Sequence, residues 1–279
     1  MQIIDFRLRP PTRGFLKSKI YAVAENRKRY TEKLGWPLVD SADVQSMDLL
    51  FTEMDDAKIT TGVVVGRTTA TLGAIPNADV AQIVADYPDR FIGIGSADSS
   101  DRKTAFAMID EILRLGLKAV NLDPGVSAVP MRADDRRLYP IYAKCEDANL
   151  PVVIMAGGGA GPDLSYNDPM AIDRMLGDFP ALKVVCSHGG WPYVQEILGV
   201  AFRRENLYLC PDMYLRGLPG TAEYLTAANG FLSERILFGT AYPFCPLKPY
   251  VDWFLAQHLS ETSLQRVLSG NARTLLSLQ

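Results

Sequence analysis

The residues with the clearest chemical potential lie where short apolar runs of the sequence end. Arg7 and Arg9 follow the first run, Ile3-Ile4-Asp5, and stand two residues apart. In an extended strand this spacing puts both side chains on one face, because the side-chain period of a strand is two. A guanidinium offers a planar fork of donors that matches two carboxylate or phosphate oxygens. The pair therefore predicts a clamp for an anionic group, and two structural arginines paired with neighbouring acids are the alternative.

His188 and Asp212 are the candidates for proton transfer. His188 is one of two histidines in the chain and follows an apolar run at 182–187. An imidazole changes its charge near neutral pH, so it can act as a general acid or base, although a lone histidine is often structural. Asp212 follows the run 206–210 and could orient His188 or take a proton itself. A salt bridge from Asp212 to one of the first two arginines is equally expected.

Other polar side chains at the ends of apolar runs could contact the same ligand. Arg67 follows the run 59–65 and adds a third guanidinium. In a barrel of parallel strands such side chains meet, because the active site is built at the carboxyl ends of the strands. The remaining candidates for contacts with a substrate are Asn121, Asp123, Tyr214 and Tyr242.

Eight short apolar runs alternate with amphipathic helical stretches along the chain. This alternation predicts an α/β fold with a parallel sheet, and the count of eight favours a closed (β/α)8 TIM barrel over an open doubly wound sheet. No Gly-x-Gly-x-x-Gly follows the first run, which argues against a dinucleotide-binding fold. The expected strands lie at 3–9, 59–65, 91–95, 117–123, 150–155, 182–188, 206–210 and 235–239.

The chain of 279 residues is expected to form one domain over residues 1–279. Residues 10–40 are rich in Lys and Arg and are too long for an ordinary loop between a strand and a helix. An insertion after the first strand would sit over the mouth of a barrel, where it could act as a basic lid. A solvated helical face is the alternative.

Composition argues against several classes of partner. The net charge is −3 and no block of five or six like charges occurs, so we expect no binding to nucleic acid. No apolar run approaches the about 18 residues of a membrane helix, and the N-terminus lacks a signal pattern, so we expect a cytoplasmic protein without a membrane partner. The four cysteines show no Cys-x-x-Cys spacing and are expected to be free thiols. A homo-oligomer is compatible with the sequence.

Several motifs together resemble a known family. They are Ile3-Ile4-Asp5, Tyr139-Pro140 before Leu150-Pro151-Val152, Ser187-His188-Gly189-Gly190, the stretch 237–244 and Gly270-Asn271-Ala272-Arg273. On these residues the chain resembles the amidohydrolase superfamily, in particular the amidohydrolase family 2 branch, which includes decarboxylases and lactonases of aromatic and dicarboxylic acid breakdown. The resemblance extends over almost the whole chain and implies a TIM barrel.

The resemblance also implies a metal site that this sequence does not reproduce. Family members typically carry His-x-His after strand one, a His after strands five and six, and an Asp after strand eight, which hold a zinc-like ion. The corresponding residues here are Arg7 and Arg9, Met155, His188 and Ala241. One imidazole cannot hold a catalytic metal, and a guanidinium does not deprotonate to act as a ligand. We therefore expect neither a metal nor another cofactor, as in relatives that act on lactones without metal.

These observations lead to an expected function and two alternatives. The expected function is metal-independent hydrolysis or rearrangement of a small carboxylated substrate, a lactone or related ester. Arg7, Arg9 and Arg67 would bind its carboxylates, and His188, aided by Asp212 or Asp123, would move the proton. The first alternative is a carboxy-lyase, because a cationic pocket equally suits decarboxylation. The second is a degenerate barrel that binds an anionic metabolite without turning it over.

Overall fold

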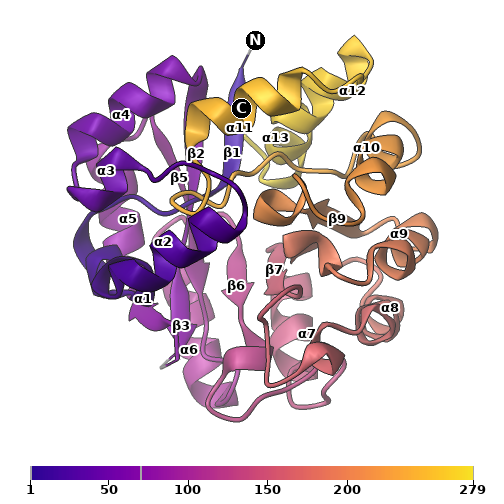
Figure 1. Cartoon of the computed structure of the whole chain (residues 1–279). Coiled ribbons are helices and arrows are strands. Elements are labelled where there is room, and N and C mark those ends of the chain that lie inside the picture. The colour runs from indigo at the N-terminus through magenta and orange to yellow at the C-terminus, as the bar shows by residue number, and fades with distance from the viewer. Residues whose placement is uncertain (1, 70, 279) are drawn as a thin grey trace.

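The computed structural model describes residues 2–69 and 71–278, which form a curled parallel sheet surrounded by helices (Figure 1). Seven of the strands in these residues make one sheet, in the order β1-β2-β5-β6-β7-β8-β9, and each neighbouring pair is parallel. The α/β fold expected from the alternation of runs is thus confirmed. The strands are β1 (Ile3–Leu8), β2 (Ile59–Val65), β5 (Phe91–Ser96), β6 (Val120–Leu122), β7 (Val152–Met155), β8 (Val184–Ser187) and β9 (Leu207–Cys210).

The expected eighth strand at 235–239 is replaced by a less regular segment. Residues 235–242 make two isolated parallel bridges, Leu209 with Ile236 and Leu8 with Tyr242, and so connect β9 to β1. One reason for the irregularity is that the backbone N–H of Thr240 donates to Oδ1 of Asp5 at 3.0 Å. The side chain of Asp5 therefore takes the place of the backbone carbonyl that would pair with Thr240 in a regular strand. The curled sheet closes through this irregular segment.

The longer helices pack around the outside of the sheet, as their apolar faces require. Asp101 is the N-cap of α6, and its side chain accepts from the backbone N–H of Thr104 at 2.7 Å. These helices are α4 (Met47–Asp56), α5 (Asn77–Asp86), α6 (Arg102–Arg114), α7 (Tyr139–Asp147), α8 (Pro169–Asp178), α9 (Val194–Arg203), α10 (Thr221–Asn229) and α11 (Leu247–Leu255), followed by the short α12 (Glu261–Gln265) and α13 (Asn271–Leu275).

Strand β1 departs from strict alternation at its carboxyl end. Ile4 and Phe6 pack in the apolar cluster inside the curled sheet, whereas Leu8 packs in the outer cluster beneath the helices. The register of β1 against β2 shifts within residues 5–8. An irregularity of this kind changes the direction in which the neighbouring side chains point. The guanidinium of Arg7 is consequently buried in the protein, with 1% of the residue exposed.

The segment 10–40 is largely helical. It contains a 3₁₀ turn (Arg13–Lys17), α1 (Lys19–Ala22) and α2 (Ala24–Lys33), and α3 (Asp40–Asp43) follows. In Figure 1, α2 lies in front of the curled sheet, and the ring of Tyr30 on α2 meets the ring of Phe244 edge-on at 5.7 Å. The sequence did not predict the small antiparallel hairpin of β3 (Arg67–Thr69) and β4 (Gly73–Ile75). No helix in the described part of the chain is long and apolar enough to cross a membrane.

Candidate active site

A cavity of about 280 Å³ opens at the carboxyl ends of the strands. The ends of β1, β7 and β8 and the helices of segment 10–40 contribute to its walls. Five lining residues are basic, Arg9, Lys19, Arg27, Arg29 and Arg67, and the lining contributed by residues 2–69 and 71–278 contains no Asp or Glu. Aromatic rings of Tyr30, Tyr214 and Phe244 complete the walls. The cavity therefore suits a small anion with a flat apolar body.

A larger cleft of about 480 Å³ lies at the opposite end of the sheet, around Lys118, Pro151 and Lys183 at the starts of β6, β7 and β8. None of the residues that the sequence predicted for the site lines it. Active sites of such barrels are built at the carboxyl ends of the strands. The smaller cavity is therefore the candidate site.

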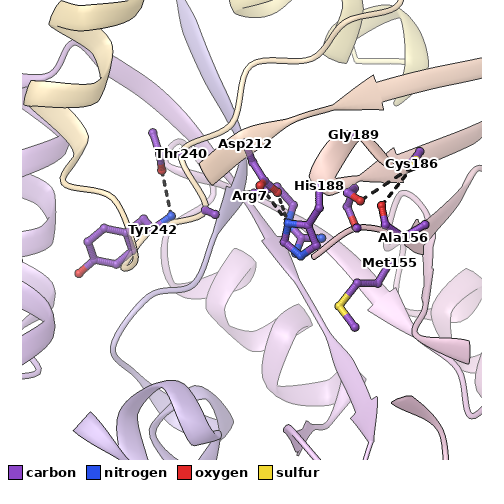
Figure 2. Close-up of polar contacts among 12 residues, drawn as sticks. Arg7, Met155, Ala156, Cys186, His188, Gly189, Asp212, Thr240 and Tyr242 are labelled. Atoms are coloured by element: carbon purple, nitrogen blue, oxygen red, sulfur yellow. Dashed lines mark hydrogen bonds and ion pairs between the residues drawn. The ribbon is translucent and has the colours of Figure 1, made fainter. Parts of the chain in front are cut away.

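His188, Asp212 and Arg7 form a connected group at this cavity (Figure 2). Nδ1 of His188 lies 2.9 Å from Oδ1 of Asp212, and Oδ2 of Asp212 lies 3.6 Å from Nε of Arg7. All three residues are buried, and His188 lines the cavity. Because Asp212 engages Nδ1, the imidazole Nε2 is the nitrogen left for a ligand.

The backbone around this group adopts an uncommon conformation. His188 has φ of 66° and Asp212 has φ of 42°, so both lie in the left-handed region that non-glycine residues seldom adopt. The hydroxyl of Tyr250 donates to the carbonyl of Asp212 at 2.5 Å and holds its turn in place. On the other side, a Cβ on Gly157 would lie 2.6 Å from Cβ of His188, so only glycine lets the loop after β7 pack here. Such strain is typical of functional sites.

Burial dominates the electrostatics of the site. It lowers the pKa of His188, and the neighbouring charge of Asp212 opposes that shift while Arg7 and Arg9 add to it. His188 is therefore neutral at pH 7, with Nε2 able to accept a proton. Burial, together with the charges of Arg7 and Arg67, also lowers the pKa of Arg9 to about 9. Arg9 still carries its charge at neutral pH.

Two of the three predicted arginines reach the cavity. Arg9 donates from Nη1 to the carbonyls of Ala241 and Tyr242, at 3.1 and 3.3 Å, and its guanidinium lies 5.8 Å from the ring centre of Phe244. Arg67 pairs through Nε with Asp123 at 2.9 Å. Arg7 does not line the cavity and instead lies behind it against Asp212.

The other residues predicted to contact a substrate do not all lie at the cavity. Tyr214 lines the cavity and meets the ring of His188 edge-on at 5.2 Å. Asp123 is occupied by its ion pair, and Asn121 is buried in β6; neither lines the cavity. Tyr242 is fully buried, and its hydroxyl bonds to Oγ of Ser41 at 2.6 Å. Figure 2 shows the ring of Tyr242 directed away from His188.

Sequence reasoning missed two kinds of residue. Asp5 is fully buried, and its carboxylate accepts from the backbone N–H of Arg7 and from both the N–H and the hydroxyl of Thr240. Asp5 thereby connects β1 to the segment around Thr240. The sequence did contain a signal for this role, because Asp5 is a carboxylate that interrupts an apolar run. The aromatic residues Tyr30 and Phe244 were missed because only tertiary packing brings them to the cavity.

The residues present do not fit the metal that the family resemblance implies. Arg7 and Arg9 occupy the positions of the usual His-x-His, and a protonated guanidinium cannot act as a ligand. His188 has already engaged Nδ1 with Asp212. Among the residues that the structure describes, no group of three or more His, Cys, Asp or Glu could hold a metal ion.

Comparisons with known proteins agree with this fold. The structure matches that of an uncharacterised TIM-barrel protein from Bordetella bronchiseptica with a TM-score of 0.98 and 55% identity, covering 100% of this chain and 99% of that one. The chain is 29% identical to a 2-amino-3-carboxymuconate-6-semialdehyde decarboxylase of Dictyostelium discoideum over 72% of this chain, but it spans only 65% of that enzyme. It is 24% identical to a γ-resorcylate decarboxylase of Polaromonas sp., over 72% of this chain and 75% of that enzyme.

The family model described as amidohydrolase matches residues 4–278, nearly the whole chain. The chain therefore belongs to the amidohydrolase family.

Proposed function

We propose that this enzyme is a carboxy-lyase, which releases CO2 from a small aromatic or unsaturated carboxylic acid without the help of a metal. The observation that carries the proposal is the cavity of about 280 Å³ whose walls are basic and aromatic and which the His188–Asp212 pair adjoins. The two curated relatives described above are both decarboxylases by name. Those names favour decarboxylation over the lactone hydrolysis that the sequence alone suggested.

Arg9 and Arg67 hold the substrate in this proposal. Both guanidinium groups line the cavity, and each is fixed from behind, Arg9 by the carbonyls of residues 241 and 242 and Arg67 by Asp123. A guanidinium whose orientation is fixed loses less entropy when it binds a carboxylate. The rings of Tyr214 and Phe244 contact the flat body of the substrate and exclude water from it.

His188 moves the proton. Decarboxylation requires a proton at the carbon that bears the carboxylate. His188 takes up a proton from solvent, either directly or through a substrate hydroxyl that solvent then reprotonates, and the resulting imidazolium transfers it from Nε2 to that carbon. The electron pair of the broken C–C bond then returns to the unsaturated system as CO2 leaves. Asp212 stabilises the imidazolium in between, and the net reaction consumes one proton for each CO2 released.

Hydrolysis of a lactone or related ester is the second candidate. The lowered pKa of His188 favours it, because a neutral imidazole can take a proton from an attacking water. In that reaction Arg9 and Arg67 would bind a carboxylate beside the lactone ring. The product would then contain an oxygen atom from water, and no CO2 would form.

A panel of substrates separates these candidates. Hydroxybenzoates, unsaturated dicarboxylates and lactones, each labelled with ¹³C in the carboxyl group, are incubated with the purified enzyme in H₂¹⁸O. Release of ¹³CO2 supports the carboxy-lyase, and ¹⁸O in a ring-opened product supports the hydrolase. His188→Asn should abolish either activity, whereas His258→Asn, at an exposed histidine, should leave it intact. Tight binding without any product would instead favour a non-catalytic binding protein.

A further inference from the structure

Three arginines converge on a second, much smaller cavity beside the candidate active site. This cavity has a volume of about 10 Å³, about enough for one water molecule. Arg7, Arg9 and Arg67 line it, and the rest of its lining is Ser18 and apolar side chains. No Asp or Glu from the described ranges contributes to that lining. Arg9 and Arg67 also line the larger cavity, so the two cavities are neighbours.

The guanidinium groups around the small cavity are buried. Arg7 is 1% exposed, Arg9 is 7% exposed, and the side chain of Arg67 is 12% exposed. The guanidinium of Arg7 makes no hydrogen bond from any of its three nitrogens to a residue of the described chain. A buried donor without an acceptor is costly, and the cost is larger for a charged group. Arg7 therefore presents donors that a bound acceptor would satisfy.

One of the three guanidinium groups has no carboxylate as an ion-pair partner among the described residues. Arg67 forms its ion pair with Asp123 at 2.9 Å, and Asp212 lies 3.6 Å from Arg7. Arg9 forms no ion pair with a carboxylate in the part of the chain that the structure covers, and its hydrogen bonds go to two carbonyls. Three guanidinium groups thus face two carboxylates.

Asp5 is the other buried acid of this region, and its oxygens are directed elsewhere. They accept from Thr240 and from the backbone N–H of Arg7, and burial raises the pKa of Asp5. Asp5 forms no ion pair with the arginines of the small cavity within residues 2–69 and 71–278. It therefore does not supply an acceptor to the unsatisfied nitrogens of Arg7.

We propose that Arg7, Arg9 and Arg67 bind one monovalent, monatomic anion of the size of chloride in this cavity. The room available is about that of one water molecule, so it suits a single atom and not the three heavy atoms of a carboxylate. A single negative charge would compensate Arg9, which has no carboxylate partner in the described chain, and a buried anion would accept hydrogen bonds from the unpaired N–H groups of Arg7. The apolar remainder of the lining excludes hydrated divalent anions, which would lose more hydration than they regain.

Binding of this anion has a consequence for the larger cavity. It relieves repulsion among the three guanidinium groups and fixes the orientation of Arg9 and Arg67, which line both cavities. The proposal does not depend on which reaction the enzyme catalyses. It can therefore be tested on the protein without a substrate.

Thermal unfolding of the full chain in chloride tests the proposal. The protein is dialysed into sodium gluconate, and gluconate is replaced stepwise by chloride at constant ionic strength. At ten times the Kd of chloride, the folding equilibrium constant should increase about elevenfold, which raises Tm by roughly 2 to 5 °C. Identical Tm values in gluconate and chloride would overturn the proposal. Stabilisation by formate greater than that by chloride would also overturn it and would indicate a subsite for a carboxylate.

Variants and direct detection localise the anion. Arg7→Met should abolish the chloride dependence of Tm, while Lys19→Met, at a basic residue that lines only the larger cavity, should retain it. If Arg7→Met does not fold, crystals of the unaltered protein soaked in bromide give the answer by anomalous diffraction. An anomalous peak between the three guanidinium groups supports the proposal, and no peak there refutes it.

Discussion

Replacing Asp212 with Asn probes the group that connects Arg7 to His188. The substitution keeps the shape of the side chain and removes its charge. Arg7 then loses the carboxylate oxygen 3.6 Å from its Nε and remains buried, with 1% of the residue exposed. Breaking a buried ion pair by removing one partner typically costs about 3 to 5 kcal/mol, because the other charge is left uncompensated. The long Arg7–Asp212 distance places the expected loss at the lower end, about 3 kcal/mol.

Urea denaturation measures this loss of unfolding free energy. Asp212→Asn should unfold at a lower urea concentration with an unchanged m value, since the same surface is exposed on unfolding. The double variant with Arg7→Met should recover part of the loss, because no uncompensated charge remains in it. Asp86→Asn, which breaks the exposed pair with Arg13, serves as the matched control and should change stability little. A loss below about 1 kcal/mol for Asp212→Asn, simply additive with that of Arg7→Met, would refute the electrostatic account of this group.

Three further predictions concern the same site. Arg9→Met should weaken binding of a carboxylate ligand at least tenfold by calorimetry, because removing one partner of a desolvated charge pair costs on the order of 2 to 5 kcal/mol; an unchanged Kd would contradict the clamp. Because the pKa of His188 is lower in the folded chain than in the unfolded one, the unfolded state binds more protons below about pH 6.5. Stability should therefore fall as the pH drops from about 6.5, and His188→Gln should reduce this fall whereas His258→Gln should not; equal pH profiles for both would contradict it. Arg67→Lys should weaken ligand binding although it keeps the charge, because an ammonium lacks the planar fork of donors; full affinity in a binding titration would contradict it.

The sequence predicted the residues at the cavity best where a residue lies within a few positions of the end of a regular strand. His188 and Tyr214 come after β8 and β9, and both lie at the cavity, as does Arg67 after β2. The position of such residues can be predicted from the two-residue period of a strand and from the location of barrel active sites at the carboxyl ends of the strands. Arg9, which directly follows β1, also reaches the cavity.

Two of the errors arise where local geometry departs from that regularity. The shifted register of β1 directs Arg7 behind the cavity, and a two-residue period cannot anticipate such a shift. Tyr242 was expected at the site, but Asp5 holds Thr240, Ala241 has φ of 56°, and the ring of Tyr242 is fully buried. The basic residues of segment 10–40 were visible in the sequence. Their position over the cavity depends on how α2 docks, and the role of this segment as a lid stays a prediction.

The fate of the solvent proton tests the proposed reaction most directly. The enzyme is treated with a chelator, its metal content is measured, and a carboxylic acid that it turns over is supplied in D₂O. The proposed mechanism predicts an unchanged rate and one deuterium for each CO2, located on the carbon that carried the carboxylate. Loss of activity on chelation with recovery on addition of Mn²⁺, or a product without CO2 release, would contradict metal-independent decarboxylation at His188.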